Sequence, residues 1–396
     1  MGIAADPAVQ AGVVEAQVAG GAVEMGARRM AFTSIPVIDI AALRGADRAA
    51  MEATAAQIGR ACETIGFFYI TNHGVPDALI GRTYAFSRRF HYSSVEQKSR
   101  VHVRLSPGTR GWIPAAAEDD DADPELYRLV EPEPDYDPLT KAHLHAAFDV
   151  TGEIAGDDPD FLAGNLMLVP NQWPDWIPGF RGQVLDYYGA VMGVGRLLFR
   201  AFAMRLGLPD DYFEQLTRKP PSQLRLLHYP PNALPMDNDH LGIGAHSDFE
   251  CFTILHQGGP GLQVMNAADE WVEAPPIDGT FIVNIGDLLE GWTNGRFKAT
   301  QHRVVNTGRE RFSLPLFFAV DYHTVIEPLP AFVTPDNPAR YNRIVAGDHL
   351  AGFSVNFAKH LRKRIVRGEL KIDFPIHKRN PFKRIAVNEF RKQDAA

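Results

Sequence analysis

The sequence contains very little cysteine and no long apolar run. Its two cysteines, Cys62 and Cys251, are too few for a disulfide framework or a thiolate metal cluster. No apolar stretch approaches the roughly 20 residues of a membrane-spanning helix, and no basic start precedes the apolar N-terminus as it would in a signal peptide. Positive charge is not in excess, because the formal net charge is -8. These absences predict a cytoplasmic protein whose main partner is neither nucleic acid nor a membrane.

The 396 residues are otherwise those of a globular protein, with 45% hydrophobic and 22% charged residues. Apolar residues recur at helical spacing over 47–65, 76–91 and 180–206. Short β-rich runs are separated by glycine, proline and asparagine turns at 35–40, 67–70, 224–228, 252–257, 262–265, 271–274, 281–285, 302–306 and 312–320. So many short strands predict an antiparallel sandwich or barrel. We therefore expect a mainly β protein with flanking α-helices.

Four segments are expected along the chain. Residues 1–33 are rich in small residues and predict a flexible extension, and 34–215 predict an α/β region that packs on the core. Residues 216–325 predict the β-rich core, and 326–396 a helical segment with a basic tail. An acidic stretch near 118–134 predicts a solvated loop, or a lid in which the segment from Arg110 to about Val150 covers the active site.

Histidine and aspartate occur in a pattern that suits a metal. Gly244-Ala245-His246-Ser247-Asp248 is followed much later by Gln301-His302-Arg303. In a strand, His246 and Asp248 would point to the same side, and a later strand could bring His302 to them. Two imidazoles and one carboxylate on one face of an octahedron are typical of non-haem iron(II) enzymes that activate O2. The pair alone is weak in a chain with 14 histidines, where it is usually a coincidence.

A second signal follows the third histidine. Arg311-Phe312-Ser313 lies in an otherwise apolar strand, in which Arg311 and Ser313 share one face. A buried guanidinium needs an anion, and it binds a carboxylate through two parallel hydrogen bonds. The anion could be a ligand, or a distant acidic side chain of the protein itself. Tyr229, on an earlier strand, is a further candidate donor.

With these motifs assembled, the sequence resembles the isopenicillin N synthase-like branch of the iron(II)/2-oxoglutarate-dependent dioxygenases. The family's His-x-Asp…His and Arg-x-Ser motifs match His246-Ser247-Asp248, His302 and Arg311-Phe312-Ser313. Residues 35–39 and 66–75 resemble the opening segment of the family, and Asn171-Gln172-Trp173-Pro174 resembles a segment of its microbial members. The resemblance spans roughly residues 35 to 330.

The resemblance implies a double-stranded β-helix, or jelly roll, with flanking helices. It implies Fe(II) as the metal, 2-oxoglutarate as cosubstrate and O2 as oxidant, with succinate and CO2 as products and hydroxylation of a small organic molecule as the default reaction. It also implies that Arg311, Ser313 and Tyr229 hold the distal carboxylate of 2-oxoglutarate, and that Asn284 lies inside the barrel near the metal. The alternatives are an oxidase of the same branch that uses no 2-oxoglutarate, and a non-catalytic jelly-roll binding protein.

The substrate is predicted only from residue type. Trp112, where many relatives carry tyrosine, is expected to form an apolar wall over the site. Further pocket candidates are Phe249, Phe317, Phe318 and Tyr322, which suggest a small, partly apolar or aromatic molecule. The sequence predicts a monomer or a homo-oligomer without deciding between them.

Overall fold

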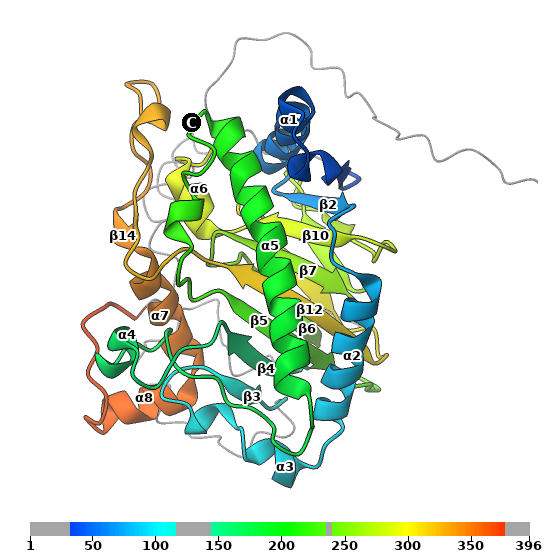
Figure 1. The fold of residues 1–396 in the computed structure, drawn as a ribbon, viewed down its shortest axis with the longest axis vertical. Coiled ribbons are helices and arrows are strands. Elements are labelled where there is room, and N and C mark those ends of the chain that lie inside the picture. Colours follow the sequence, from blue (N-terminus) through cyan, green and yellow to red (C-terminus); the bar gives the residue numbers. More distant parts are fainter. Residues whose placement is uncertain (1–31, 116–143, 235–239, 377–396) are drawn as a thin grey trace, which may run out of the picture.

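A computed structural model describes residues 32–115, 144–234 and 240–376 (Figure 1). Its main strands are β1 (Val37–Asp39), β2 (Phe67–Thr71), β3 (Gly111–Ile113), β4 (Ala146–Thr151), β5 (Gln223–Tyr229), β6 (Leu241–His246), β7 (Phe252–Gln257), β8 (Leu262–Met265), β9 (Trp271–Glu273), β10 (Phe281–Ile285), β11 (His302–Val305) and β12 (Arg311–Phe318). They form an eight-stranded sheet in the order β1-β2-β10-β7-β12-β5-β4-β3 and a four-stranded sheet in the order β6-β11-β8-β9. A short pair, β13 (Val325–Ile326) and β14 (Ile344–Val345), lies apart from both.

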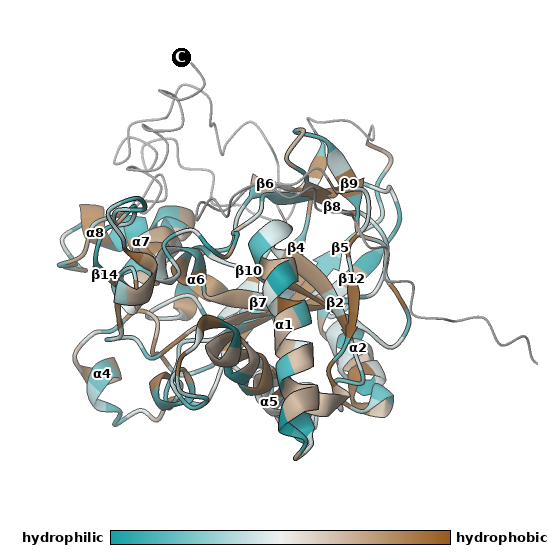
Figure 2. Cartoon of the chain, turned by 90° about the horizontal axis from the view of Figure 1, so that it is seen from above, coloured by the Kyte–Doolittle hydropathy of each residue, from teal (hydrophilic) through white to brown (hydrophobic). Residues whose placement is uncertain are grey.

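The helices are α1 (Arg48–Thr64), α2 (Asp77–His91), α3 (Val95–Ser99), α4 (Pro159–Leu162), α5 (Phe180–Leu206), α6 (Asp287–Trp292), α7 (Ala346–Phe357) and α8 (Lys359–Val366). Seen from above, α1, α2 and α5 cover one face of the large sheet, and β6, β8 and β9 cover the other (Figure 2). The molecule therefore has three layers, namely helices, large sheet and small sheet. Among the described helices, none combines the length and apolar character that a bilayer crossing requires.

Successive side chains of each strand point to opposite sides, so the large sheet has two different surfaces. In β12, Phe312, Leu314 and Phe318 join the apolar core beneath the helices, while Arg311 and Ser313 point the opposite way, toward the small sheet. A second apolar cluster lies between the two sheets, and its larger members are Phe32, Phe67, Tyr69, Leu227, Tyr229, Leu262, Val264, Ile282 and Val304. The facing sheets thus enclose an interior that is apolar apart from a few polar side chains.

Helix α5 packs closely on the outer surface of this sheet (Figure 1). Phe199 of α5 lies edge-on to Phe252 and Phe318, whose rings stack at a centroid distance of 4.8 Å. Gly195 faces the same ring system, and a Cβ built there would lie 2.0 Å from Cε2 of Phe318. The small residue lets the helix approach the sheet.

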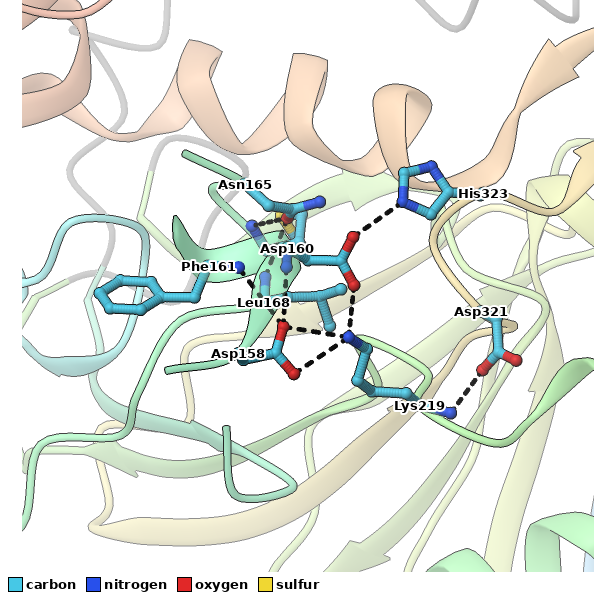
Figure 3. Close-up of polar contacts among 9 residues, drawn as sticks. Asp158, Asp160, Phe161, Asn165, Leu168, Lys219, Asp321 and His323 are labelled. Atoms are coloured by element: carbon cyan, nitrogen blue, oxygen red, sulfur yellow. Dashed lines mark hydrogen bonds and ion pairs between the residues drawn. The ribbon is translucent and has the colours of Figure 1, made fainter. Parts of the chain in front are cut away.

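A charged cluster ties the segment around α4 to the end of the large sheet (Figure 3). The ammonium of Lys219 donates to both carboxylate oxygens of Asp158 at 3.0 Å and also contacts Asp160. His323 contacts Asp160 at 3.0 Å, and the backbone N–H of Lys219 donates to Asp321 at 2.7 Å. Because the Lys219 side chain is 40% exposed, the cluster fastens a surface segment rather than forming part of the enclosed interior.

The sequence predicts the main elements and misses several connecting ones. Helices 47–65, 76–91 and 180–206 correspond to α1, α2 and α5, and the predicted mainly β fold with flanking helices is confirmed. Residues 34–215 do more than pack on the core, because they supply β1 to β4 of the large sheet itself. The predictions for the N-terminal extension up to residue 31, the acidic lid between 116 and 143, and the tail beyond 376 lie outside the described residues.

The close approach of α5 leads to a test of its packing. Gly195→Ala should destabilise the fold by about 1–3 kcal/mol, because overpacking forces the Phe318 ring to move. Gly193→Ala is the matched control in the same helix, where a Cβ meets nothing within 4 Å. It should stabilise by up to about 1 kcal/mol through helix propensity. Urea denaturation measures both, and equal stabilities of the two variants would contradict the packing described.

Candidate metal and cosubstrate site

The two histidines and the aspartate predicted as ligands meet at the end of the small sheet. Strand β6 ends at His246, β11 begins at His302, and these two residues are paired directly in the sheet. Asp248 follows two residues after the end of β6, so it reaches the histidines from a loop and not from the strand that the sequence predicts. One ligand atom from each of the three lies within 4.8 Å of the others. The spacing suits one metal ion between them.

Backbone carbonyls orient both imidazoles. Nδ1 of His246 lies 2.8 Å from the carbonyl oxygen of Gly244, and Nδ1 of His302 lies 3.2 Å from that of Thr300. A carbonyl can only accept, so each Nδ1 carries the proton and each Nε2 keeps its lone pair. The two Nε2 atoms lie 3.5 and 3.6 Å from Oδ1 of Asp248. All three donor atoms therefore converge.

Asp248 is fixed from the large sheet. Its Oδ2 accepts a hydrogen bond from the hydroxyl of Thr253 in β7 and another, of 2.7 Å, from the amide nitrogen of Asn284 in β10. Oδ1 is left to face the imidazoles. The sequence predicts Asn284 near the metal, and the structure places it behind the Asp248 carboxylate. Thr253 is missed, because a threonine inside a β-rich run carries no signal of its own.

The electrostatics of the three residues suit metal binding. Burial raises the pKa of Asp248, but the nearby His302 and His246 outweigh this and hold it well below the usual range. Burial, together with the neighbouring His246, lowers the pKa of His302 to about 4. For His246, burial acts to lower the pKa, but Asp248 raises it overall. At neutral pH Asp248 is ionised and His302 is neutral, which are the states that bind a metal.

A second polar group lies in the same interior. Arg311 of β12 is paired with Tyr229 of β5, and its guanidinium lies 4.7 Å from the centre of the Tyr229 ring. Its Nε donates to the carbonyl of Gly259 at 3.1 Å. Within the described parts of the chain, Nη1 of Arg311 and Oγ of Ser313 are buried without a well-formed hydrogen bond, and the Tyr229 hydroxyl is the polar group beside them. Such groups are costly to bury without a partner, so the arrangement fits an anionic ligand such as the distal carboxylate of 2-oxoglutarate.

The aromatic residues predicted around the substrate do not all reach this interior. Trp112 pairs with Phe148 in the sheet and belongs to the core beneath the helices, where it is 1% exposed. Phe318 belongs to the same core. Their positions do not support a role in the substrate pocket, because strand parity turns both toward the helices.

Three other candidates lie elsewhere. Side chains alternate along β12, so Phe317 points to the same side as Arg311 and Ser313 and faces the interior. Phe249, next to Asp248, stacks on Phe353 of α7 at a centroid distance of 3.7 Å. Tyr322 donates a 2.9 Å hydrogen bond to Asp348 of the same helix. Of the predicted aromatic residues, Phe317 and Phe249 thus remain adjacent to the site.

Comparison with known proteins agrees with this geometry. Residues 220–320 match the 2OG-Fe(II) oxygenase superfamily, and residues 35–176 match a domain described as non-haem dioxygenase in morphine synthesis N-terminal. A 2-oxoglutarate-Fe(II) type oxidoreductase of Emericella nidulans is 34% identical over 332 residues, covering 82% of this chain and 90% of the relative. A homoarginine-6-hydroxylase of Glycine max is 32% identical, covering 81% of this chain and 96% of the relative.

The fold has solved counterparts as well. A full-length Neurospora crassa protein, solved in complex with alpha-KG, superposes with a TM-score of 0.67 at 25% identity, covering 80% of this chain and 94% of that one. Fold and site together define a non-haem iron oxygenase. The chain belongs to the 2OG-Fe(II) oxygenase superfamily, and its cofactors are Fe(II), 2-oxoglutarate and O2. The two alternatives left by the sequence, an oxidase without 2-oxoglutarate and a non-catalytic binding protein, are thereby disfavoured.

The hydrogen bonds that fix the Asp248 carboxylate provide a test of the metal site. Thr253→Val removes one hydrogen bond to Oδ2 and should weaken Fe(II) binding by about 10–100-fold, as loss of a group that orients a ligand usually does. Thr253→Ser keeps the hydroxyl and is the matched control. Anaerobic Fe(II) titration measures both. Wild-type affinity in the valine variant would show that the hydroxyl does not position the ligand.

Proposed function

We propose that His246, Asp248 and His302 hold the iron of this oxygenase, and that Arg311, Ser313 and Tyr229 hold the distal carboxylate of 2-oxoglutarate. The observation that carries the proposal is that, among the described residues, a buried guanidinium edge and a buried hydroxyl lack well-formed hydrogen bonds and an anionic partner, in the same interior as the three proposed ligands. Within the described residues, no carboxylate forms an ion pair with Arg311, so the alternative of a structural ion pair lacks support.

The residues of the chain have distinct parts in the reaction. Iron(II), 2-oxoglutarate and O2 supply the oxidising chemistry, which yields succinate, CO2 and an oxidised product. His246, Asp248 and His302 would hold the iron, and three protein ligands would leave coordination positions for cosubstrate and oxidant. Arg311 and Ser313 anchor the far end of the cosubstrate, and the apolar cluster around Phe67, Leu227 and Val304 keeps water out.

We further propose that the substrate is a small organic molecule that is hydroxylated in the cytoplasm. Similarity to a relative named as a hydroxylase supports hydroxylation as the reaction. Both cysteines, Cys62 and Cys251, are buried and free, which agrees with a reducing compartment. The net charge of -8 supports the view that neither nucleic acid nor a membrane surface is the main partner.

The proposed metal ligands can be tested singly. His246→Ala or Asp248→Ala should abolish succinate formation, because two remaining ligands cannot hold the ion in the required geometry. The fold should persist, since the two apolar clusters do not include the ligands. Circular dichroism checks the fold, and a coupled assay checks succinate. Normal turnover with added Fe(II) in either variant would refute the ligand assignment.

The proposed cosubstrate anchor gives a second test. Arg311→Leu should raise the KM and Kd for 2-oxoglutarate by about a hundredfold or more, because loss of a buried charge partner costs roughly 3–5 kcal/mol. Arg309→Leu is the matched control, since Arg309 is two residues away and exposed. Calorimetric titration of the metal-loaded protein measures the Kd. Unchanged affinity in the Arg311 variant would mean that the anchor lies elsewhere.

A further inference from the structure

A second arginine faces the enclosed interior, and neither the iron nor 2-oxoglutarate accounts for it. Arg225 lies on β5 four residues before Tyr229, so strand alternation puts both on the inner surface of the large sheet. Four residues of a strand span about 13 Å, which is the distance along β5 between Arg225 and Tyr229. Arg225 is therefore further along the inner surface than the pair formed by Arg311 and Tyr229.

Arg225 is held by a buried carboxylate on the neighbouring strand. Its Nε and Nη2 each donate to Asp149 of β4 at 2.7 Å, a two-pronged ion pair. The Asp149 side chain is 1% exposed, whereas that of Arg225 is 26% exposed. Nη1 is not used in this pair, and the guanidinium lies 5.7 Å from the centre of the Phe317 ring. The arginine is thus oriented, with one edge left for another partner.

A second guanidinium group lies beside this ion pair. Gln223 donates to Asp149 at 3.0 Å and accepts a 2.9 Å hydrogen bond from Arg110, which is fully buried. The other acceptors of Arg110 are neutral, namely the Thr109 hydroxyl and the Met167 carbonyl. Two guanidinium groups therefore lie around Asp149, and the edges that this carboxylate does not use can donate to a further anion.

The position of this cluster is next to the metal ligands. Phe317, whose ring lies beside the Arg225 guanidinium, is paired in the sheet with Thr253, and the Thr253 hydroxyl donates to Asp248. Glu250 is a second, more distant carboxylate that attracts Arg225, and among the described residues Asp149 is the one within ion-pair distance. The ring of Phe317, on the inner surface, gives the Arg225 guanidinium an apolar neighbour.

We propose that Arg225 binds a carboxylate of the substrate, so that this oxygenase acts on small carboxylic acids. The inference rests on the proposed function, in which Arg311 is reserved for 2-oxoglutarate. Asp149 and Gln223 hold the guanidinium in place, and Nη1 donates to the incoming carboxylate. The Phe317 ring packs against the carbon skeleton beside it. Arg225 acts in substrate binding and orientation, and takes no part in the chemical step.

The test compares each of three acids with its uncharged analogue. Benzoate, phenylacetate and hexanoate are titrated, each beside its primary amide, into the full chain loaded anaerobically with Fe(II) and 2-oxoglutarate. In the wild-type protein, at least one acid should bind about tenfold or more tightly than its amide, because a site built for a charged partner rejects the neutral one. Calorimetry or equilibrium dialysis measures the Kd.

Variants connect the preference to the residue. In Arg225→Gln the acid should lose its advantage, to within about twofold of the amide. Arg181→Gln is the matched control, since it removes the same charge from an exposed ion pair with Glu153, and it should keep the preference. Arg225→Lys keeps the charge without the planar fork, so it should weaken acid binding by about tenfold and leave amide binding alone. If the glutamine variant does not fold, the lysine variant decides.

Each outcome supports or overturns the proposal. Equal binding of acid and amide by the wild type, a preference that persists in Arg225→Gln, or no acid bound at millimolar concentration overturns it. Binding of 2-oxoglutarate to the wild type is measured first. If that fails, the proposed function is wrong, whereas its success combined with a missing acid preference refutes only the role of Arg225.

Discussion

The structure of the site depends on the fixation of one carboxylate. Asp248 lies in a loop after β6, yet its Oδ2 is bound by Thr253 and Asn284 from the opposite sheet. This is the point at which the two sheets meet through polar groups beside the predicted metal. With Oδ2 occupied, Oδ1 is directed at the two imidazoles, whose own orientation is set by backbone carbonyls. The loop residue thereby becomes as well positioned as the strand residues beside it.

The alternation of side chains along each strand gives the two faces of the large sheet different roles. Alternate residues of β12 stabilise the fold beneath α5 or face the interior, so Phe318 and Arg311 have unrelated roles despite belonging to one strand. The same alternation in β5 puts Arg225, Leu227 and Tyr229 on the inner surface. Two arginines at different levels along neighbouring strands give the interior two places where an anion is favoured. An enzyme that binds an acidic cosubstrate and an acidic substrate together needs such a separation, since like charges repel.

Much of this could be predicted from local sequence pattern. Helix α5 and strands β7, β8 and β10 have the bounds that periodicity indicates, because spacing of apolar residues is a local property. The candidate ligands His246, Asp248 and His302 could be named because their motif can be read directly in the linear sequence. The register between strands could not be predicted, so Thr253 and the Asp149–Arg225 pair are missed. Residue type alone assigns Trp112 and Phe318 to the pocket, and only the face of each strand shows that they pack under the helices.

The central claim is that one interior holds a metal and 2-oxoglutarate together, each contributing to the binding of the other. The most direct measurement is the affinity for 2-oxoglutarate, by anaerobic calorimetry, with and without Fe(II). The account predicts one molecule bound per chain and an affinity at least about tenfold higher with the metal, with the same factor found for metal binding in the presence of 2-oxoglutarate. Affinities that are independent of each other would contradict it, because the cosubstrate would then bind away from His246, Asp248 and His302.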